Sequence, residues 1–252
     1  MSRSCGVTHP GMKRSNNQDT FFSSDENGFW VLADGMGGNK GGEIASRIAQ
    51  ESIVEGLKNS VELKTAILTA HRSILDYGTK HQELVGLATT IVLLKESFTN
   101  AEASLAWVGD SRAYLWRNQT LSQLSKDHSV VQRLLDSGMI TPEEAIDHPK
   151  RNLVTSILGL SLSNESDLEI GMVDFKWRKG DKILLCSDGL TDELSDSDIV
   201  EIMSAHSSSE KQMEALLQAA LSAGGRDNTT VVLIEAPPIK SLVQRILNWF
   251  KT

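Results

Sequence analysis

Five aspartates stand where apolar segments of the chain begin or end. Asp34, Asp110 and Asp188 each follow an apolar run and precede Gly or Ser. Asp19 and Asp227 each come shortly before such a run. If several strand ends meet at one edge of a sheet, these carboxylates form a dense cluster of negative charge, which needs a cation to stay ionised. Oxygen ligands of this kind suit Mg²⁺ or Mn²⁺ better than Zn²⁺.

A pair of such ions predicts phosphate chemistry. Two divalent ions about 3.5–4 Å apart share a water, lower its pKa and direct it at phosphorus. The alternative explanation is turn chemistry, because Asp before Gly is common in tight turns. That explanation suffices for any one position. It is weaker for several Asp-Gly, Asp-Ser and Asp-Asn steps that all adjoin strongly apolar runs.

Other phosphate and metal motifs do not match. The glycine-rich stretch DGMGGNKGG (34–42) fits neither GxxxxGK[ST] nor GxGxxG, the spacings that nucleotide-binding loops need. No pair of His or Cys residues has zinc-site spacing, and no EF-hand spacing occurs near Asp188. The aspartates therefore remain the main candidates for chemistry.

The composition predicts a cytoplasmic protein. The 252 residues include 25 Lys and Arg against 33 Asp and Glu, a formal net charge of −8. This balance argues against nucleic acid as a partner, because phosphate backbones are bound by an excess of Lys and Arg. We find no signal peptide and no run near the ~20 apolar residues of a membrane-spanning helix. Two cysteines, Cys5 and Cys186, are too few for a disulfide framework and fit a reducing compartment. We expect a monomer.

Short apolar segments and amphipathic patterns predict an α+β fold. The predicted strands, which are rich in β-branched and aromatic residues, are 28–34, 89–94, 104–110, 112–116, 182–188 and 229–235. Strands 104–110 and 112–116 flank a Gly-Asp-Ser turn, and residues 117–120 offer another turn. This spacing favours antiparallel hairpins over strand-helix-strand units.

Helical patterns come in two pairs, one before and one after most of the strands. The first pair is 43–57 and 63–77. The second is 199–203, which Ser195 or Ser197 would cap, and 213–221, which Gly224-Gly225 would end. We therefore expect two stacked antiparallel β-sheets, a β-sandwich, flanked by helical pairs in α-β-β-α layers. Residues 1–236 would form one domain, with 129–166 as an insertion.

Seven blocks of the sequence resemble, in order and spacing, the signature blocks of a known family. This family is that of the metal-dependent type 2C serine/threonine protein phosphatases, in their compact bacterial form. The resemblance extends from about residue 3 to 235, and it implies that residues 1–236 are a catalytic domain with 129–166 as its flap. The blocks are KRSNNQD (13–19), VLADGMGG (31–38), GLATT (86–90), VGDSRAYL (108–115), LSKDHS (124–129), LLCSDGL (184–190) and GGRDNTT (224–230).

The resemblance implies a ligand set for two Mg²⁺ or Mn²⁺ ions. Asp34 would bridge the ions, and the backbone carbonyl of Gly35 would bind one of them. Asp188 and Asp227 would complete the shell of the first ion. Asp19 would act from the outer shell through water.

The remaining matched positions concern phosphate and a third ion. Arg14 would bind the substrate phosphate, since a guanidinium fork suits two phosphate oxygens at once. Asp110 matches the position that, with Asp188, binds a third, weaker ion in bacterial relatives. Asn228 would orient Asp227, and a role in turn formation is an equal alternative.

The reaction that the resemblance implies is hydrolysis of phosphoserine and phosphothreonine by in-line attack of a metal-bridged hydroxide. The partners would be phosphorylated proteins and a Ser/Thr kinase whose action the enzyme opposes. The alternative is a phosphoprotein-binding regulatory module with the same fold and little turnover. The intact set of Asp34, Asp188 and Asp227 favours the enzyme.

Two residues depart from patterns in the family. Met36 stands where eukaryotic members have His, a proposed general acid, and a thioether cannot donate a proton. Gln18 stands where many members have Glu, so the second metal ion would be held more loosely. Outside the site, we expect His128 to anchor the loop after strand 120–124 and Cys186 to be a small core residue.

The tail 237–252 has a separate pattern. Its apolar residues have helical spacing, and its charged residues, Lys240, Arg245 and Lys251, are all basic. An amphipathic helix here would dock on the catalytic domain, bind a partner or lie at the inner face of the membrane. The apolar residues are Ile239, Leu242, Val243, Ile246, Leu247 and Phe250.

Overall fold

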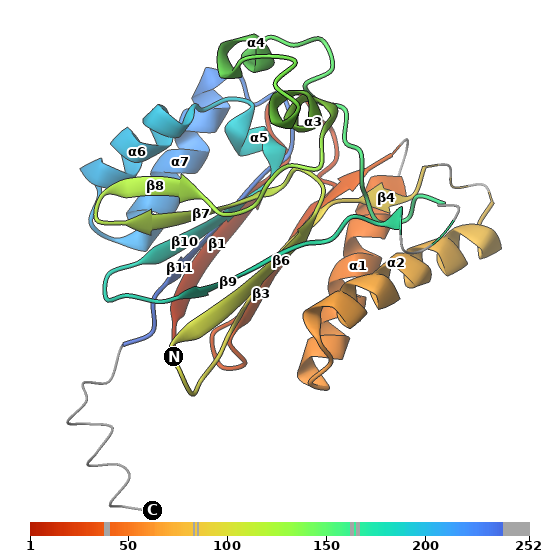
Figure 1. The fold of residues 1–252 in the computed structure, drawn as a ribbon, viewed down its shortest axis with the longest axis horizontal. Helices are drawn as coiled ribbons and strands as arrows, with labels where there is room; N and C mark the ends of the chain where they lie inside the picture. The colour runs from red at the N-terminus through yellow and green to blue at the C-terminus, as the bar shows by residue number, and fades with distance from the viewer. Residues whose placement is uncertain (38–40, 83, 85, 162–163, 165–166, 239–252) are drawn as a thin grey trace, which may run out of the picture.

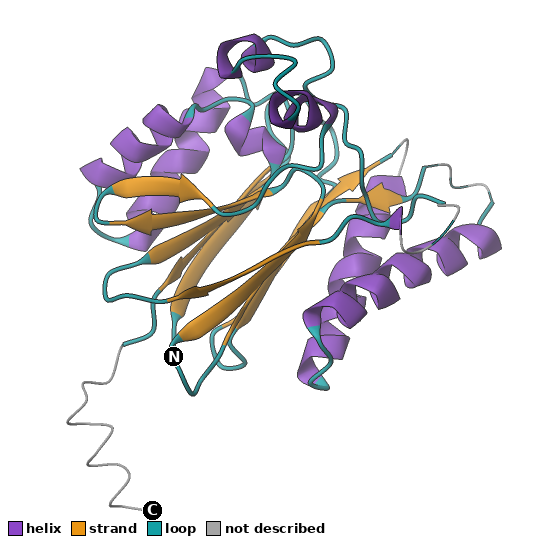
Figure 2. Cartoon of the chain, in the orientation of Figure 1, coloured by secondary structure: helices purple, strands orange, loops and turns teal. Residues whose placement is uncertain are grey.

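The computed structural model describes residues 1–37, 41–82, 84, 86–161, 164 and 167–238. Within these ranges, two antiparallel β-sheets stack face to face, and a pair of helices covers the outer face of each sheet (Figures 1 and 2). The predicted α-β-β-α layering is confirmed. The tail segment 239–252 lies outside the described residues.

Each sheet draws strands from distant parts of the chain. The five-stranded sheet has the order β1 (Arg3–His9), β11 (Thr229–Glu235), β10 (Lys182–Cys186), β7 (Arg112–Arg117) and β8 (Thr120–Gln123). The six-stranded sheet has the order β2 (Asp19–Ser24), β3 (Phe29–Met36), β5 (Ile91–Glu96), β6 (Glu102–Val108) and β9 (Gly171–Lys176), with β4 (Ala88–Thr89) paired to β3.

Strand β3 shows why the central strands are apolar on both faces. Alternate side chains of a strand point to opposite faces of its sheet. Trp30 and Leu32 belong to the core between the two sheets, whereas Phe29, Val31 and Ala33 belong to the core under the helices. A strand covered on both sides therefore reads as a continuous apolar run.

The helices form the outer layers. Helices α1 (Gly41–Lys58) and α2 (Leu63–Lys80) contribute to the core on the six-stranded sheet. Helices α6 (Asp196–Ala205) and α7 (Ser209–Ala223) contribute to the core on the five-stranded sheet. Ser195 caps α6 by accepting a hydrogen bond from the backbone N–H of Asp198, which confirms one of the two predicted caps.

The predicted hairpin around residues 109–111 is wrong. Strand β6 pairs with β5 and β9, whereas β7 pairs with β8 and β10, so this link crosses from one sheet to the other. Gly109 has a φ of 106°, and a Cβ atom there would lie 2.6 Å from the side chain of Thr90. The second predicted turn is confirmed, because β7 and β8 form a hairpin through Asn118 and Gln119.

Three more short helices lie near one end of the sandwich. Helix α5 (Asp188–Thr191) directly follows β10, and α3 (Val130–Asp136) and α4 (Pro142–Ile146) lie in the segment expected to be a flap. Figure 1 shows α3, α4 and α5 gathered beyond the same ends of the strands. Among the helices described, none is long and apolar enough to cross a membrane.

Candidate metal and phosphate site

The predicted aspartates meet at one end of the sandwich. Asp19 begins β2 and lies directly opposite Asp34 near the end of β3, in antiparallel register. Ser187, at the end of β10, joins the two sheets by donating a hydrogen bond from Oγ to Asp19 Oδ2 at 2.8 Å. Asp188 follows Ser187, and Asp227 lies two residues before β11.

Hydrogen bonds of Thr90 connect the segment of Asp110 to the same end of the sandwich. The backbone N–H of Thr90 donates to the carbonyl of Asp34 at 2.8 Å. The Thr90 hydroxyl is 2.7 Å from the hydroxyl of Ser111, the neighbour of Asp110. The link between the two sheets therefore carries the fifth carboxylate to the cluster.

The carboxylates interact strongly with one another. Burial raises the pKa of Asp34 well above its ordinary value, and the charges of Asp19, Asp188, Asp110 and Asp227 raise it further. Burial and neighbouring carboxylates, first among them Asp110, likewise raise the pKa of Asp188. Such shifts mean that the ionised cluster is costly without a compensating cation.

Asp19 and Asp110 are affected in the same direction. Burial raises the pKa of Asp19 to about 6, although Thr230 and Ser187 oppose the shift by donating hydrogen bonds to its carboxylate. Burial and the charge of Asp127 raise the pKa of Asp110 to about 6. The Oδ1 atom of Asp19 is buried and has no hydrogen-bond partner among the described residues.

Arg14 reaches the cluster from the loop between β1 and β2. Its Nε donates to Asp227 Oδ1 at 2.9 Å, and its Nη2 donates to Asp227 Oδ2 at 2.6 Å. The predicted phosphate-binding cation therefore pairs with a predicted metal ligand. Arg14 remains largely exposed, so solvent and anions can reach its guanidinium.

Asn228 holds the Arg14 loop to the turn that carries Asp227. Its Oδ1 accepts a hydrogen bond from the backbone N–H of Gln18 at 2.7 Å. Its Nδ2 donates to the carbonyls of Pro10 and Asn16 at 2.9 and 2.8 Å. Asn228 thus bridges segments more than 200 residues apart, a wider role than the two predicted for it.

Gly35 is required by close packing of the backbone. A Cβ atom at this position would lie 2.1 Å from the carbonyl oxygen of Gly42, so no larger residue fits beside the start of α1. The N–H of Gly35 donates to the carbonyl of Gln18 at 3.1 Å. The Gln18 side chain donates to the carbonyl of Gly37 at 3.2 Å, and Met36 is half-buried next to it.

The residues present fit divalent metal ions by their chemistry. The cluster offers mutually repelling carboxylates and a buried, unpartnered Asp19 oxygen, both of which a hard cation would satisfy. As the side chains stand, no three His, Cys, Asp or Glu residues in the described ranges together form a site that could hold a metal ion. In this arrangement Arg14 engages both carboxylate oxygens of Asp227.

Several supporting residues were not predicted from the sequence. Ser187 and Thr230 both donate hydrogen bonds to Asp19, at 2.8 and 2.6 Å. Glu193 and Arg226 form an ion pair beside Asp227. Ser187 lies in the block LLCSDGL and Thr230 in the block GGRDNTT, so their membership of blocks that contain a candidate aspartate was the available signal.

His128 contacts the turn that precedes Asp110. Its ring Nδ1 accepts a hydrogen bond from the backbone N–H of Gly109 at 3.1 Å, and its backbone N–H donates to the Gly109 carbonyl at 2.9 Å. This agrees with the anchoring role expected for it. Cys186 is buried within β10, as expected of a core residue.

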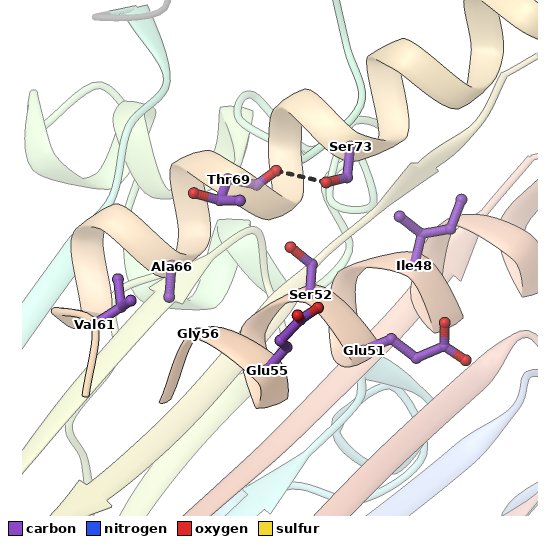
Figure 3. Close-up of a pocket in the computed structure, with 9 residues that line it drawn as sticks. All are labelled: Ile48, Glu51, Ser52, Glu55, Gly56, Val61, Ala66, Thr69 and Ser73. Carbon is purple, nitrogen blue, oxygen red and sulfur yellow. Dashed lines mark hydrogen bonds between the residues drawn. The ribbon is translucent and has the colours of Figure 1, made fainter. Parts of the chain in front are cut away.

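A groove between α1 and α2 is separate from this site. Figure 3 shows its lining, which includes Glu51, Glu55, Thr69 and Ser73. Its volume is about 450 Å³, and none of the five clustered aspartates lines it. The groove therefore contributes nothing to the chemistry of the cluster.

Known proteins resemble this chain over most of its length. The model of the protein phosphatase 2C family matches residues 6–223. The serine/threonine phosphatase stp of Listeria welshimeri is 33% identical over 241 residues, which cover 90% of this chain and 93% of that protein.

Solved structures share the fold. The crystal structure of the serine/threonine phosphatase PstP/Ppp of Mycobacterium tuberculosis aligns with a TM-score of 0.82 and 32% identity, over 94% of this chain and 99% of that one. The catalytic domain of PstP in complex with two manganese ions aligns with a TM-score of 0.81 and 31% identity, over 93% of this chain and 97% of that one. This chain therefore belongs to the protein phosphatase 2C family.

Proposed function

We propose that this chain, a serine/threonine protein phosphatase, hydrolyses phosphoserine and phosphothreonine at the cluster of Asp19, Asp34, Asp110, Asp188 and Asp227. The observation that carries the proposal is the convergence of these carboxylates at one end of the sandwich, where burial and the charges of neighbouring aspartates raise the pKa of Asp34 and of Asp188. The manganese-bound relative and the relatives named as phosphatases support catalysis over a purely regulatory role.

Four groups would hold two Mg²⁺ or Mn²⁺ ions: the carboxylates of Asp34, Asp188 and Asp227 and the backbone carbonyl of Gly35. When bound, the ions would supply a nucleophilic water at neutral pH and offset the negative charge of the cluster. Asp19 would act from the outer shell through water, and its buried Oδ1, which has no hydrogen-bond partner among the described residues, supports this role. Asp110, beside Asp188, would contribute to a third and weaker site.

Arg14 would bind the phosphate of the substrate. Its guanidinium presents a fork of N–H donors that already engages two carboxylate oxygens of Asp227. The same fork matches two phosphate oxygens. Charge on the phosphoryl oxygens would be stabilised there, the effect that dominates phosphoryl transfer.

The proton for the departing serine oxygen would not come from Met36. A thioether has no proton to donate. Solvent at the open end of the cluster is the simplest source, since Met36 is only half-buried and Arg14 is exposed. His at position 36 is therefore not required for the proposed reaction.

The partners and location remain predictions. Phosphorylated proteins would be the substrates, a Ser/Thr kinase would act in opposition, and the protein would be a cytoplasmic monomer. The segment 129–166 would help to select substrates. Docking, partner binding and membrane contact by the tail 237–252 stay alternatives, to be separated by fractionation and thermal melting of a protein that ends at residue 236.

The proposal is tested with a phosphothreonine peptide and an aryl phosphate. We expect hydrolysis of both with Mn²⁺, no hydrolysis with EDTA, and none by Asp34→Asn at any Mn²⁺ concentration. Asp174→Asn, a change on the edge strand β9, is the control and should keep full activity. Undiminished hydrolysis by Asp34→Asn would remove the role assigned to this cluster.

A further inference from the structure

An ion pair with a buried carboxylate joins two segments that each carry a predicted metal ligand. The backbone N–H and the Nε of Arg226 both donate to Glu193 Oε1 at 2.9 Å, and Nη2 donates to Oε2 at 3.1 Å. The side chain of Glu193 is only 2% exposed, whereas that of Arg226 is 57% exposed. We refer to these contacts as the Glu193–Arg226 clamp.

The clamp holds the end of α5. Arg226 Nη2 also donates to the carbonyl of Asp192 at 2.8 Å, which is the C-cap residue of α5. Carbonyls at the end of a helix have no partner within the helix and need one from outside. Because α5 has only four residues and starts with Asp188, restraint of its end also restrains Asp188.

The other end of α5 is restrained by close packing. A Cβ atom on Gly189 would lie 2.0 Å from the carbonyl oxygen of Asn228. The start of α5 therefore rests against the turn that follows Asp227, while the clamp holds its end to the residue that precedes Asp227. Both ends of the helix are positioned against one turn.

The same turn is adapted to receive Glu193. Gly224 has a φ of 157°, and a Cβ atom there would lie 3.1 Å from Glu193 Oε2. The backbone N–H of Met12 also donates to the carbonyl of Gly225 at 2.7 Å, which attaches the loop of Arg14 to this turn. The turn 224–228 thus connects the segments of Asp188, Asp227 and Arg14.

We propose that Glu193 and Arg226 are positioning residues that fix Asp188 and Asp227 relative to each other for divalent metal binding. The inference rests on the proposed function of the cluster. Neither residue touches the substrate in this role, and both act through the two aspartates. Partners that orient metal ligands typically change metal affinity about 10–100-fold when they are removed.

A second ion pair provides a matched control. Arg117 donates from Nε and Nη2 to Asp181 at 2.9 and 2.6 Å, and Nη2 also donates to the carbonyl of Lys176 at 2.9 Å. The Asp181 carboxylate is likewise 2% exposed. This pair therefore has the same chemistry as the clamp, but it joins β7 and β10 at the ends opposite to those beside Asp110 and Asp188.

The experiment compares Mn²⁺ affinity by isothermal titration calorimetry in the wild type, Arg226→Ala and Arg117→Ala, at a temperature where all remain folded. We expect both variants to melt earlier, but only Arg226→Ala to bind Mn²⁺ about 10–100-fold more weakly. Arg226→Lys keeps the charge without the fork and should fall in between. If Arg226→Ala does not fold, the Mn²⁺ affinity of Arg226→Lys is compared with that of the wild type instead. Hydrolysis by Arg226→Ala should recover at high Mn²⁺ concentration.

Equal Mn²⁺ affinity in the wild type and Arg226→Ala would overturn the proposal, as would an equal loss in Arg117→Ala. Failure of the clamp and failure of the proposed function are distinguishable. A wild type that binds Mn²⁺ and hydrolyses no phosphopeptide contradicts the function alone. A variant with undiminished affinity in an active enzyme contradicts the clamp alone.

Discussion

Arg14 and Asp227 form a two-point ion pair, with Nε to Oδ1 at 2.9 Å and Nη2 to Oδ2 at 2.6 Å. The cation proposed to bind phosphate thus occupies both oxygens of a carboxylate proposed to bind metal. Each partner must give up part of this pair to perform its role. Occupation of Asp227 by a cation would release donors of Arg14 for phosphate.

Arg14→Ala should separate metal binding from substrate binding. The variant loses its phosphate donors, so we expect kcat/KM for a phosphopeptide to fall at least about 100-fold, as for loss of a charge-assisted contact in the transition state. Its Mn²⁺ affinity should rise, because Asp227 no longer has a competing cation. Calorimetric titration checks the second expectation, and a weaker affinity in Arg14→Ala would contradict the exchange.

Gln18→Glu should strengthen metal binding. The Gln18 side chain now donates to the carbonyl of Gly37, and a carboxylate cannot make that hydrogen bond. A carboxylate would instead add a charged oxygen ligand near Gly35, which hard cations prefer. We expect tighter binding of the second Mn²⁺ and a lower melting temperature of the metal-free protein. Unchanged affinity in a Mn²⁺ titration would show that charge at this position is unimportant.

Asn228→Ala should loosen the site and the fold together. The substitution leaves the N–H of Gln18 and the carbonyls of Pro10 and Asn16 without this partner. Loss of such contacts costs about 2–4 kcal/mol of the free energy of unfolding, measured by urea denaturation. Asn228→Asp keeps the acceptor for Gln18 and should lose less. A variant as stable as the wild type would contradict the bridging role.

The two thiols should resist alkylation in the folded protein. Burial raises the pKa of Cys5 to about 11 and that of Cys186 to about 12. The thiol form is neutral, so a raised pKa reduces the reactive thiolate at any pH below it. Relative to a thiol of pKa 9, Cys5 should have about 100-fold less thiolate at pH 8.

Mass spectrometry after iodoacetamide treatment checks this expectation. Modification should be slow in the native protein and rapid in urea, and Cys5 should react before Cys186 because it is less buried. Rapid labelling of Cys186 in the native protein would indicate that β10 opens.

Local patterns were sufficient for the layers of the fold. Short runs rich in β-branched and aromatic residues predicted most central strands, and helical spacing predicted α1, α2, α6 and α7. Strands β1, β2 and β9 were not predicted. Strand β1 has few large apolar side chains, and β9 lies at a sheet edge with alternate side chains exposed. Strands that bury few large side chains have only a weak apolar pattern in the sequence.

The assignment of strands to sheets could not be read from local patterns. Residues 104–110 and 112–116 look like a hairpin because only a short turn separates them. The structure places them in different sheets, where each has an antiparallel partner on both sides. Pairing is decided by contacts between distant segments, which no short window of sequence contains.

The sequence by itself determined which residues can do the chemistry, because carboxylates that adjoin buried strands must lie where those strands end. Only the tertiary structure decided how these residues meet: Arg14 on Asp227, Thr230 and Ser187 on Asp19, and Arg226 on Glu193. These contacts join segments tens to hundreds of residues apart. Their geometry depends on how the two sheets stack. A local sequence pattern carries no information about which distant segments this stacking brings together.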